Sequence, residues 1–178
     1  VSNISAAQAS SITVRGDQTT ALTLALQNAS GTADSVTLNL TSGATSGAST
    51  TNVDVAGLSI VGVETLNIAA TTGAATTTGA DDISFASGGA DKLTAVNLSG
   101  SADITFVGTN ITLPVTVTDT GTGKLTVSGN FATGSVINGS PTAVNAFTVT
   151  VTGTAFDAHG VVSEVIVTRP LPVRTPPI

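Results

Sequence analysis

The sequence predicts an all-β fold, either β-solenoid-like or a two-sheet β-sandwich. A short phrase with Asn between two apolar residues occurs three times, at Ser35–Leu40, Val63–Ile68 and Leu93–Leu98, and its asparagines are 28 and 30 residues apart. Repeats of this size indicate stacked structural units. Apolar and polar residues alternate in each copy, which is the period of a strand with one buried face. Turn signals follow about every 8 to 12 residues, a spacing typical of all-β proteins.

The composition predicts a thin core. The chain of 178 residues is the size of one ordinary domain, which we expect to cover residues 1–168. Thr, Ser, Ala and Gly make up roughly half of the sequence, well above ordinary usage. The hydrophobic fraction is still 40%, but the aromatic residues are five Phe. We therefore expect closely packed aliphatic sheets joined by loops rich in Gly, Ser and Thr.

The first half of the chain contains one weak helical pattern and several strand patterns. Ile4–Ala9 fits a single helical turn or no regular structure. Alternating apolar residues then predict strands at 12–14, 22–26, 36–40 and 63–68. Low-complexity segments at 41–52 and 71–80 predict long surface loops.

Two polar features of the phrases carry structural predictions. Glu64 shares strand parity with the apolar residues of its phrase, where a buried carboxylate would be costly. We therefore expect the strand to begin at Thr65 and Glu64 to cap the turn after Gly62. The asparagines of the phrases either form a ladder on stacked strands or are three exposed polar positions.

The second half continues the strand pattern. The expected strands cover 83–85, 93–98, 104–106, 111–117, 125–127, 147–151 and 161–167. Pro114 cannot donate to a ladder, so the strand that contains it is predicted to be an edge strand or to be bulged. Phe156–Gly160 is expected to be a turn between two strands. Four of the six prolines fall within the last nine residues, which predicts an extended, Pro-rich tail over 169–178.

Charge excludes some classes of partner. Five basic residues against eleven acidic ones give a net charge of −6. Nucleic-acid binding and adhesion to an anionic membrane both need Lys and Arg, which are scarce here. No apolar run approaches the roughly 20 residues of a membrane-spanning helix, so membrane insertion is not expected. An acidic, Thr-rich surface suits solubility and divalent cations.

The residue types do not favour an enzyme. The single histidine, His159, lies near Asp157, but no nucleophile elbow accompanies them, and the chain has no Cys. Paired carboxylates can cleave glycosidic bonds, but sugar sites usually also contain Tyr or Trp, which are absent. Asp81 and Asp82 are adjacent, so in an extended strand they point to opposite faces. No catalytic residue is therefore predicted.

The phrases resemble a known family. Gly62–Ile68, preceded by Ala33–Leu40 and a loop of Ser, Gly and Ala, is similar to the bacterial crystalline surface-layer proteins related to RTX-type secreted proteins. The resemblance covers roughly residues 10 to 130. It implies a β-solenoid or β-layer, lattice assembly that depends on calcium, and export from the cell.

The resemblance also implies calcium sites in turns. The family uses Gly-Gly-x-Gly-x-Asp turns, and the nearest matches here are Gly79–Asp82 and Gly88–Asp91. Asp81, Asp82 and Asp91 are therefore the candidate calcium ligands. The alternative is that they are solvated turn residues, because Asp and Gly tolerate tight turns and Asp caps nearby amides.

We expect a structural protein that assembles with copies of itself into an extracellular layer or filament at the cell surface. The expected partner is a second copy, with a cell-surface glycan as a further candidate. One alternative is a virion structural protein of a phage, such as a decoration or tail component. Another is a β-helix that binds or cleaves polysaccharide.

Overall fold

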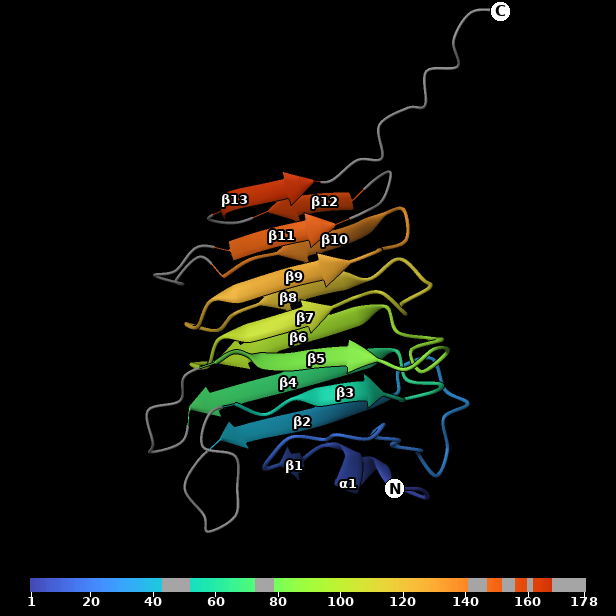
Figure 1. Cartoon of the computed structure of the whole chain (residues 1–178). Coiled ribbons are helices and arrows are strands. Elements are labelled where there is room, and N and C mark those ends of the chain that lie inside the picture. The colour runs from blue at the N-terminus through green and yellow to red at the C-terminus, as the bar shows by residue number, and fades with distance from the viewer. Residues whose placement is uncertain (43–51, 73–78, 141–146, 152–155, 160–161, 168–178) are drawn as a thin grey trace, which may run out of the picture.

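The computed structural model describes residues 1–42, 52–72, 79–140, 147–151, 156–159 and 162–167, with side chains described up to residue 140 except at 42 and 72. In this part of the chain, two parallel β-sheets face each other and one short helix lies at an end (Figure 1). The predicted all-β class is confirmed. Most of the loops predicted at 41–52 and 71–80, and the tail predicted at 169–178, lie outside the described residues.

The strands alternate between the two sheets. Across the first sheet the order is β1 (Ile12–Val14), β2 (Ser35–Ser42), β4 (Thr65–Thr72), β6 (Ala95–Gly100), β8 (Thr116–Asp119), β10 (Ser135–Asn138) and β12 (Phe156–His159). Across the second sheet the order is β3 (Val55–Leu58), β5 (Asp81–Phe85), β7 (Ile104–Val107), β9 (Leu125–Gly129), β11 (Phe147–Val151) and β13 (Val162–Val167). From β2 onward, each strand is followed by a strand of the opposite sheet.

The core consists of aligned columns of small aliphatic side chains between the sheets. One column of the first sheet contains, in register, Val36, Leu66, Val96, Val117 and Ile137. All five are fully buried. Because side chains alternate between the two faces of a strand, the residues between them point outward. The thin aliphatic core is therefore as predicted.

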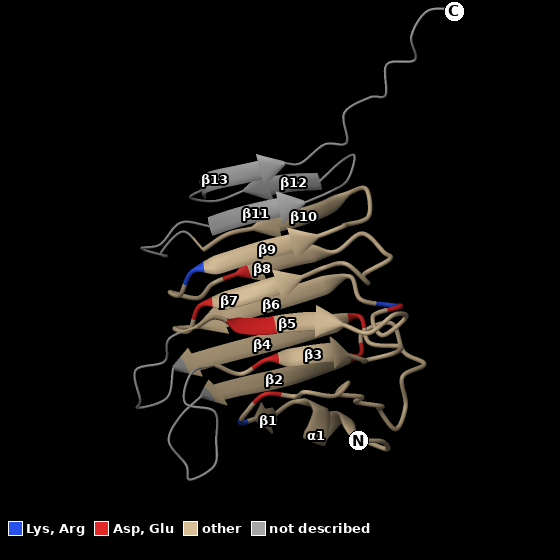
Figure 2. Cartoon of the chain, viewed as in Figure 1, with Lys and Arg blue, Asp and Glu red and all other residues tan. Residues whose placement is uncertain are grey.

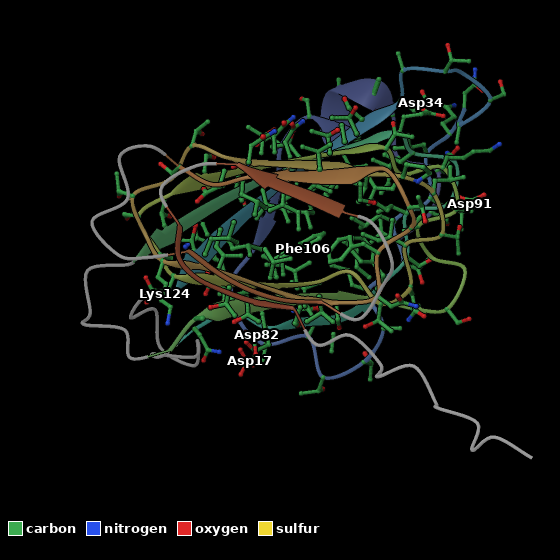
Figure 3. The ribbon with its side chains drawn as sticks, turned by 90° about the horizontal axis from the view of Figure 1, so that it is seen from above. Asp17, Asp34, Asp82, Asp91, Phe106 and Lys124 are labelled. Carbon is green, nitrogen blue, oxygen red and sulfur yellow. The ribbon has the colours of Figure 1, made fainter. Side chains whose placement is uncertain are left out.

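The second sheet adds an aromatic contact. Ile83–Phe85 and Ile104–Phe106 have similar sequences, but the register pairs Ile83 with Phe106, a shift of two residues. A shift of two keeps every side chain on its face. The rings of Phe85 and Phe106 therefore meet edge to face, with centroids 5.8 Å apart and an interplanar angle of 75°. Figure 3 shows Phe106 between the two sheets.

The asparagine ladder exists in part. Asn67 and Asn97 stand opposite each other, and Asn97 Nδ2 donates to Asn67 Oδ1 at 2.8 Å. Asn67 Nδ2 in turn donates to Thr37 Oγ1 at 3.3 Å. Asn39 pairs with Ala69 instead, so of the two alternatives the ladder holds for Asn67 and Asn97 and does not extend to Asn39. The first phrase is shifted by two residues relative to the others.

The N-terminal segment covers one end of the sheets. Helix α1 (Ala6–Ala9) is the single helical turn that the sequence allowed, and it begins with a capping box between Ser5 and Gln8. Ala9 is fully buried. No helix in the described residues is long and apolar enough to cross a membrane.

The strand predicted at 22–26 is wrong. This segment pairs only at single positions, Thr23 with Ser59 and Leu26 with Ile4. Leu24 is buried, whereas Leu22 and Leu26 are partly buried against the core. Because the segment pairs with two different partners within four residues, no continuous ladder forms, although the leucines still pack inward.

Two other predictions are corrected. The strand predicted at 111–117 is only β8 and begins at Thr116, between β6 and β10. Pro114 therefore precedes an interior strand and does not mark an edge or a bulge, which fits its missing N–H. The turn predicted at 156–160 is wrong as well, because Phe156–His159 forms β12 and pairs with β10.

Candidate functional site

The described carboxylates gather in two rows at the ends of the strands (Figure 2). In the first row, Asp54 and Asp103 directly precede β3 and β7, and Asp81 opens β5. In the second row, Asp34 and Glu64 directly precede β2 and β4. We call one strand of each sheet, together with the turns that join them, a layer. Corresponding turns of successive layers lie on the same side of the structure, so their carboxylates line up in rows.

In the first row, carboxylates connect neighbouring layers. Asp17 Oδ1 accepts a hydrogen bond from the backbone N–H of Asp54 at 3.1 Å, and Asp54 Oδ1 accepts one from Asp82 at 3.4 Å. Asp103 Oδ1 accepts the N–H of Lys124 at 2.7 Å. In each pair the donor and the acceptor are 21 to 37 residues apart in sequence. These side chains therefore stabilise the stacking of one turn on the next.

The second row has the same arrangement. Glu64 Oε2 accepts the N–H of Asp34 at 2.8 Å, and Asp91 Oδ1 accepts the N–H of Gly62 at 2.8 Å. The strand begins at Thr65, as predicted. The amide that Glu64 caps lies one layer away, however, and not in the turn after Gly62.

Asp81 is the most deeply buried carboxylic acid among the described side chains. Its side chain points between the sheets and is 1% exposed. Oδ1 accepts the backbone N–H of Val53 at 2.8 Å, whereas buried Oδ2 has no hydrogen-bond partner. Burial raises the pKa of Asp81 to about 6; the N–H of Val53 opposes this rise, and the charges of Asp54, Asp82 and Asp17 add to it.

Two other carboxyl groups are perturbed. Partial burial raises the pKa of Asp54, and the charges of Asp82 and Asp17 add to the rise. Asp119 occupies an inward position opposite Leu98 and is 4% exposed. Burial raises the pKa of Asp119, while the N–H groups of Gly121 and Ser140 lower it. Because two backbone amides bind this carboxylate, its burial is compensated.

Asp81→Asn is expected to stabilise the protein at neutral pH. The pKa of Asp81 in the folded protein lies above 3.8, the ordinary value for an aspartic acid. Its contribution to stability is therefore fully present below about pH 4 and is lost as pH rises through about 6. A shift of this size corresponds to at most about 3 kcal/mol. Denaturant unfolding should show the variant more stable than wild type at pH 7.5 by up to this amount, with the difference vanishing near pH 4.

The matched control is Asp82→Asn. It removes the same charge from the neighbouring, outward-facing residue, and surface changes of this kind usually alter stability by less than about 0.5 kcal/mol. If both variants show the same dependence on pH, the burial of Asp81 is not its cause.

The structure does not bring the three candidate calcium ligands together. Asp81 points inward and Asp82 outward from the start of β5, as predicted for adjacent strand residues. Asp91 lies in the turn beyond the other end of β5, and Figure 3 shows it far from Asp82 and Asp17. Within the described residues, no group of three His, Cys, Asp or Glu side chains is arranged to hold a metal ion.

A small cavity of about 390 Å³ lies at the N-terminal end, and no pattern in the sequence predicts it. Its lining includes apolar Ile4 and Leu26 beside polar Asn28, Asp34 and Ser35. Asp34 Oδ2 already accepts the N–H of Gly31 at 3.1 Å, so its carboxylate is partly committed to the turn. All of its lining residues come from the first 35 residues of the chain.

Comparison of the chain with family models, curated proteins and solved structures gives no match.

Proposed function

We propose that this chain is a structural protein, a β-solenoid whose copies assemble into an extracellular layer or filament. The observation that carries the proposal is the use of the carboxylates. Every Asp and Glu up to residue 140, where side chains are described, accepts a backbone N–H with the exception of Asp82, and most of these amides belong to a neighbouring layer. Most of these carboxylates therefore hold one layer of the structure against the next.

The strand order supports the solenoid form. All described strand pairs are parallel, and successive strands from β2 onward belong to opposite sheets. Parallel neighbours need a crossover between them, and here a strand of the opposite sheet supplies it. A chain that coils in this way accounts for both the repeat of the phrases and the alternation.

The strand edges support assembly. The N-terminal end carries α1 and the irregular segment around Thr23. At the other end of the described structure, β12 and β13 are the outermost strands of their sheets. Exposed strand edges present unpaired backbone groups and favour pairing with further chains. Among the described residues, the N-terminal end is therefore blunted, and β12 and β13 form the opposite end of the two sheets.

Electron microscopy of the purified, concentrated protein tests this function. We expect ordered sheets or filaments, and dispersed single particles at every concentration would contradict the proposal. The calcium part is tested separately by adding either calcium or a chelator. We propose that calcium assists assembly through the acidic rows, so an assembly that is unchanged in chelator would remove calcium from the proposal and leave the structural role.

A further inference from the structure

The outward face of the first sheet, from β2 to β10, contains no charged side chain among the described residues. We call this surface the uncharged face. Its outward residues are Ser35, Thr37, Asn39 and Thr41 of β2; Thr65, Asn67, Ala69 and Thr71 of β4; Ala95, Asn97 and Ser99 of β6; Thr116 and Thr118 of β8; and Val136 and Asn138 of β10. All are small, and most carry a hydroxyl or an amide group.

The uncharged face is a regular and rigid array. Its central column contains, in register, Thr37, Asn67, Asn97, Thr118 and Asn138. Hydrogen bonds of 2.8 Å from Asn97 to Asn67 and 3.3 Å from Asn67 to Thr37 hold part of this column in place. Side chains fixed in this way lose little conformational freedom on binding.

Charge explains why a second copy is the partner that fits. The protein has a net charge of −6, so two copies repel each other wherever their carboxylates meet. The described carboxylates lie near the ends of strands, and the second sheet exposes Asp82 on its outward side (Figure 2). The uncharged face spans five strands without a carboxylate, whereas the outward side of the second sheet carries Asp82 on β5, so two copies that meet through the uncharged face oppose no like charges.

We propose that the uncharged face binds the same face of a second copy, in a two-fold, face-to-face contact. This inference rests on the proposed structural function and names the surface that carries it. Identical polar columns can interdigitate across such a contact, and Asn ladders add to it.

The size of the face predicts a weak contact that needs many copies. Five strands about 4.8 Å apart, each with about six residues of 3.3 Å, give roughly 500 Å² per copy. The total of roughly 1,000 Å² lies at the lower limit for a specific interface. A single pair of copies should therefore dissociate easily, whereas in an assembly the many contacts act together and hold each copy more tightly.

Two matched glutamate variants test the inference. Thr118→Glu places a carboxylate in the central column of the uncharged face, and Thr126→Glu places one on the outward side of β9 in the second sheet. Both threonines are half-buried, and both lie in interior strands between uncharged neighbours. Like charges that face each other across a contact cost several kcal/mol, so Thr118→Glu should raise the concentration needed for assembly by more than about tenfold. Thr126→Glu should leave it nearly unchanged.

Light scattering gives the readout, and circular dichroism checks that both variants fold. Because the chain has no Cys, Thr118→Cys and Thr126→Cys each introduce a single thiol, and a short bismaleimide should link copies through the former only. If wild type assembles and Thr118→Glu assembles equally well, the uncharged face is not the interface, but the structural function stands. If wild type never assembles, both proposals are overturned.

Discussion

Phe106→Ala is expected to lower the free energy of unfolding by about 3–5 kcal/mol, the range for truncating a buried phenylalanine. Phe106 is fully buried between the sheets and contacts the ring of Phe85 edge to face. The core has few other aromatic groups, and neighbouring small aliphatic residues cannot fill the cavity that the ring leaves. The measurement is chemical denaturation followed by circular dichroism.

Phe106→Leu is the control for this prediction. It keeps most of the apolar volume and should cost less than about 1.5 kcal/mol. Equal losses in the two variants would mean that the position is sensitive to any change of shape. A loss below 1 kcal/mol for Phe106→Ala would contradict the described packing, because a ring at that position could not then be buried.

Gly100→Ala is expected to destabilise the protein by a similar amount. Gly100 ends β6 with a φ of 109°, and an added Cβ would lie 1.8 Å from the carbonyl oxygen of Ala70 in the adjacent strand. That oxygen accepts the N–H groups of Ser101 and Ala102, at 2.9 and 3.2 Å, so it cannot move without breaking these bonds. Backbone strain of about 1–3 kcal/mol and overpacking of about 1–3 kcal/mol together give roughly 2–6 kcal/mol.

Gly88→Ala separates the two causes. Gly88 also has a positive φ, of 71°, but an added Cβ there meets nothing within 4 Å. This variant should therefore show only the conformational cost of about 1–2 kcal/mol. If thermal or denaturant unfolding shows the same loss of stability for both variants, contact with the carbonyl of Ala70 is not the reason why residue 100 must be a glycine.

Alternation predicted most strand positions, although not β3, β10 or β12, and it could not predict registers. The phrases around Asn67 and Asn97 align as the sequence suggests, whereas Asn39 is displaced by two residues. A displacement of two leaves the same apolar residues facing the core, so the hydrophobic pattern cannot distinguish the two registers. The same ambiguity applies to Phe85 and Phe106.

Prediction was least successful where pairing is discontinuous. The leucines at 22–26 alternate as strand residues do, yet their backbone pairs with two partners at the end of the stack. Periodicity reports which side chains are buried, and it does not report whether a partner strand lies alongside.

The candidate site was only partly predictable. Asp81 shares parity with the inward-facing Ile83 and Phe85, so its direction could have been recognised in the sequence. Its raised pKa depends first on burial, which the N–H of Val53 opposes, and then on the charges of Asp54, Asp82 and Asp17. The burial that leaves Oδ2 unpartnered exists only once the strands are packed. The rows of carboxylates likewise become visible only when the layers are stacked.

The most direct test of the central claim is sedimentation velocity of the unmodified protein over a wide range of concentrations. If the protein assembles with copies of itself, its sedimentation coefficient should rise with concentration, well beyond that of a 17.3 kDa monomer. A single monomer boundary at every concentration, with and without divalent cations, would contradict the account.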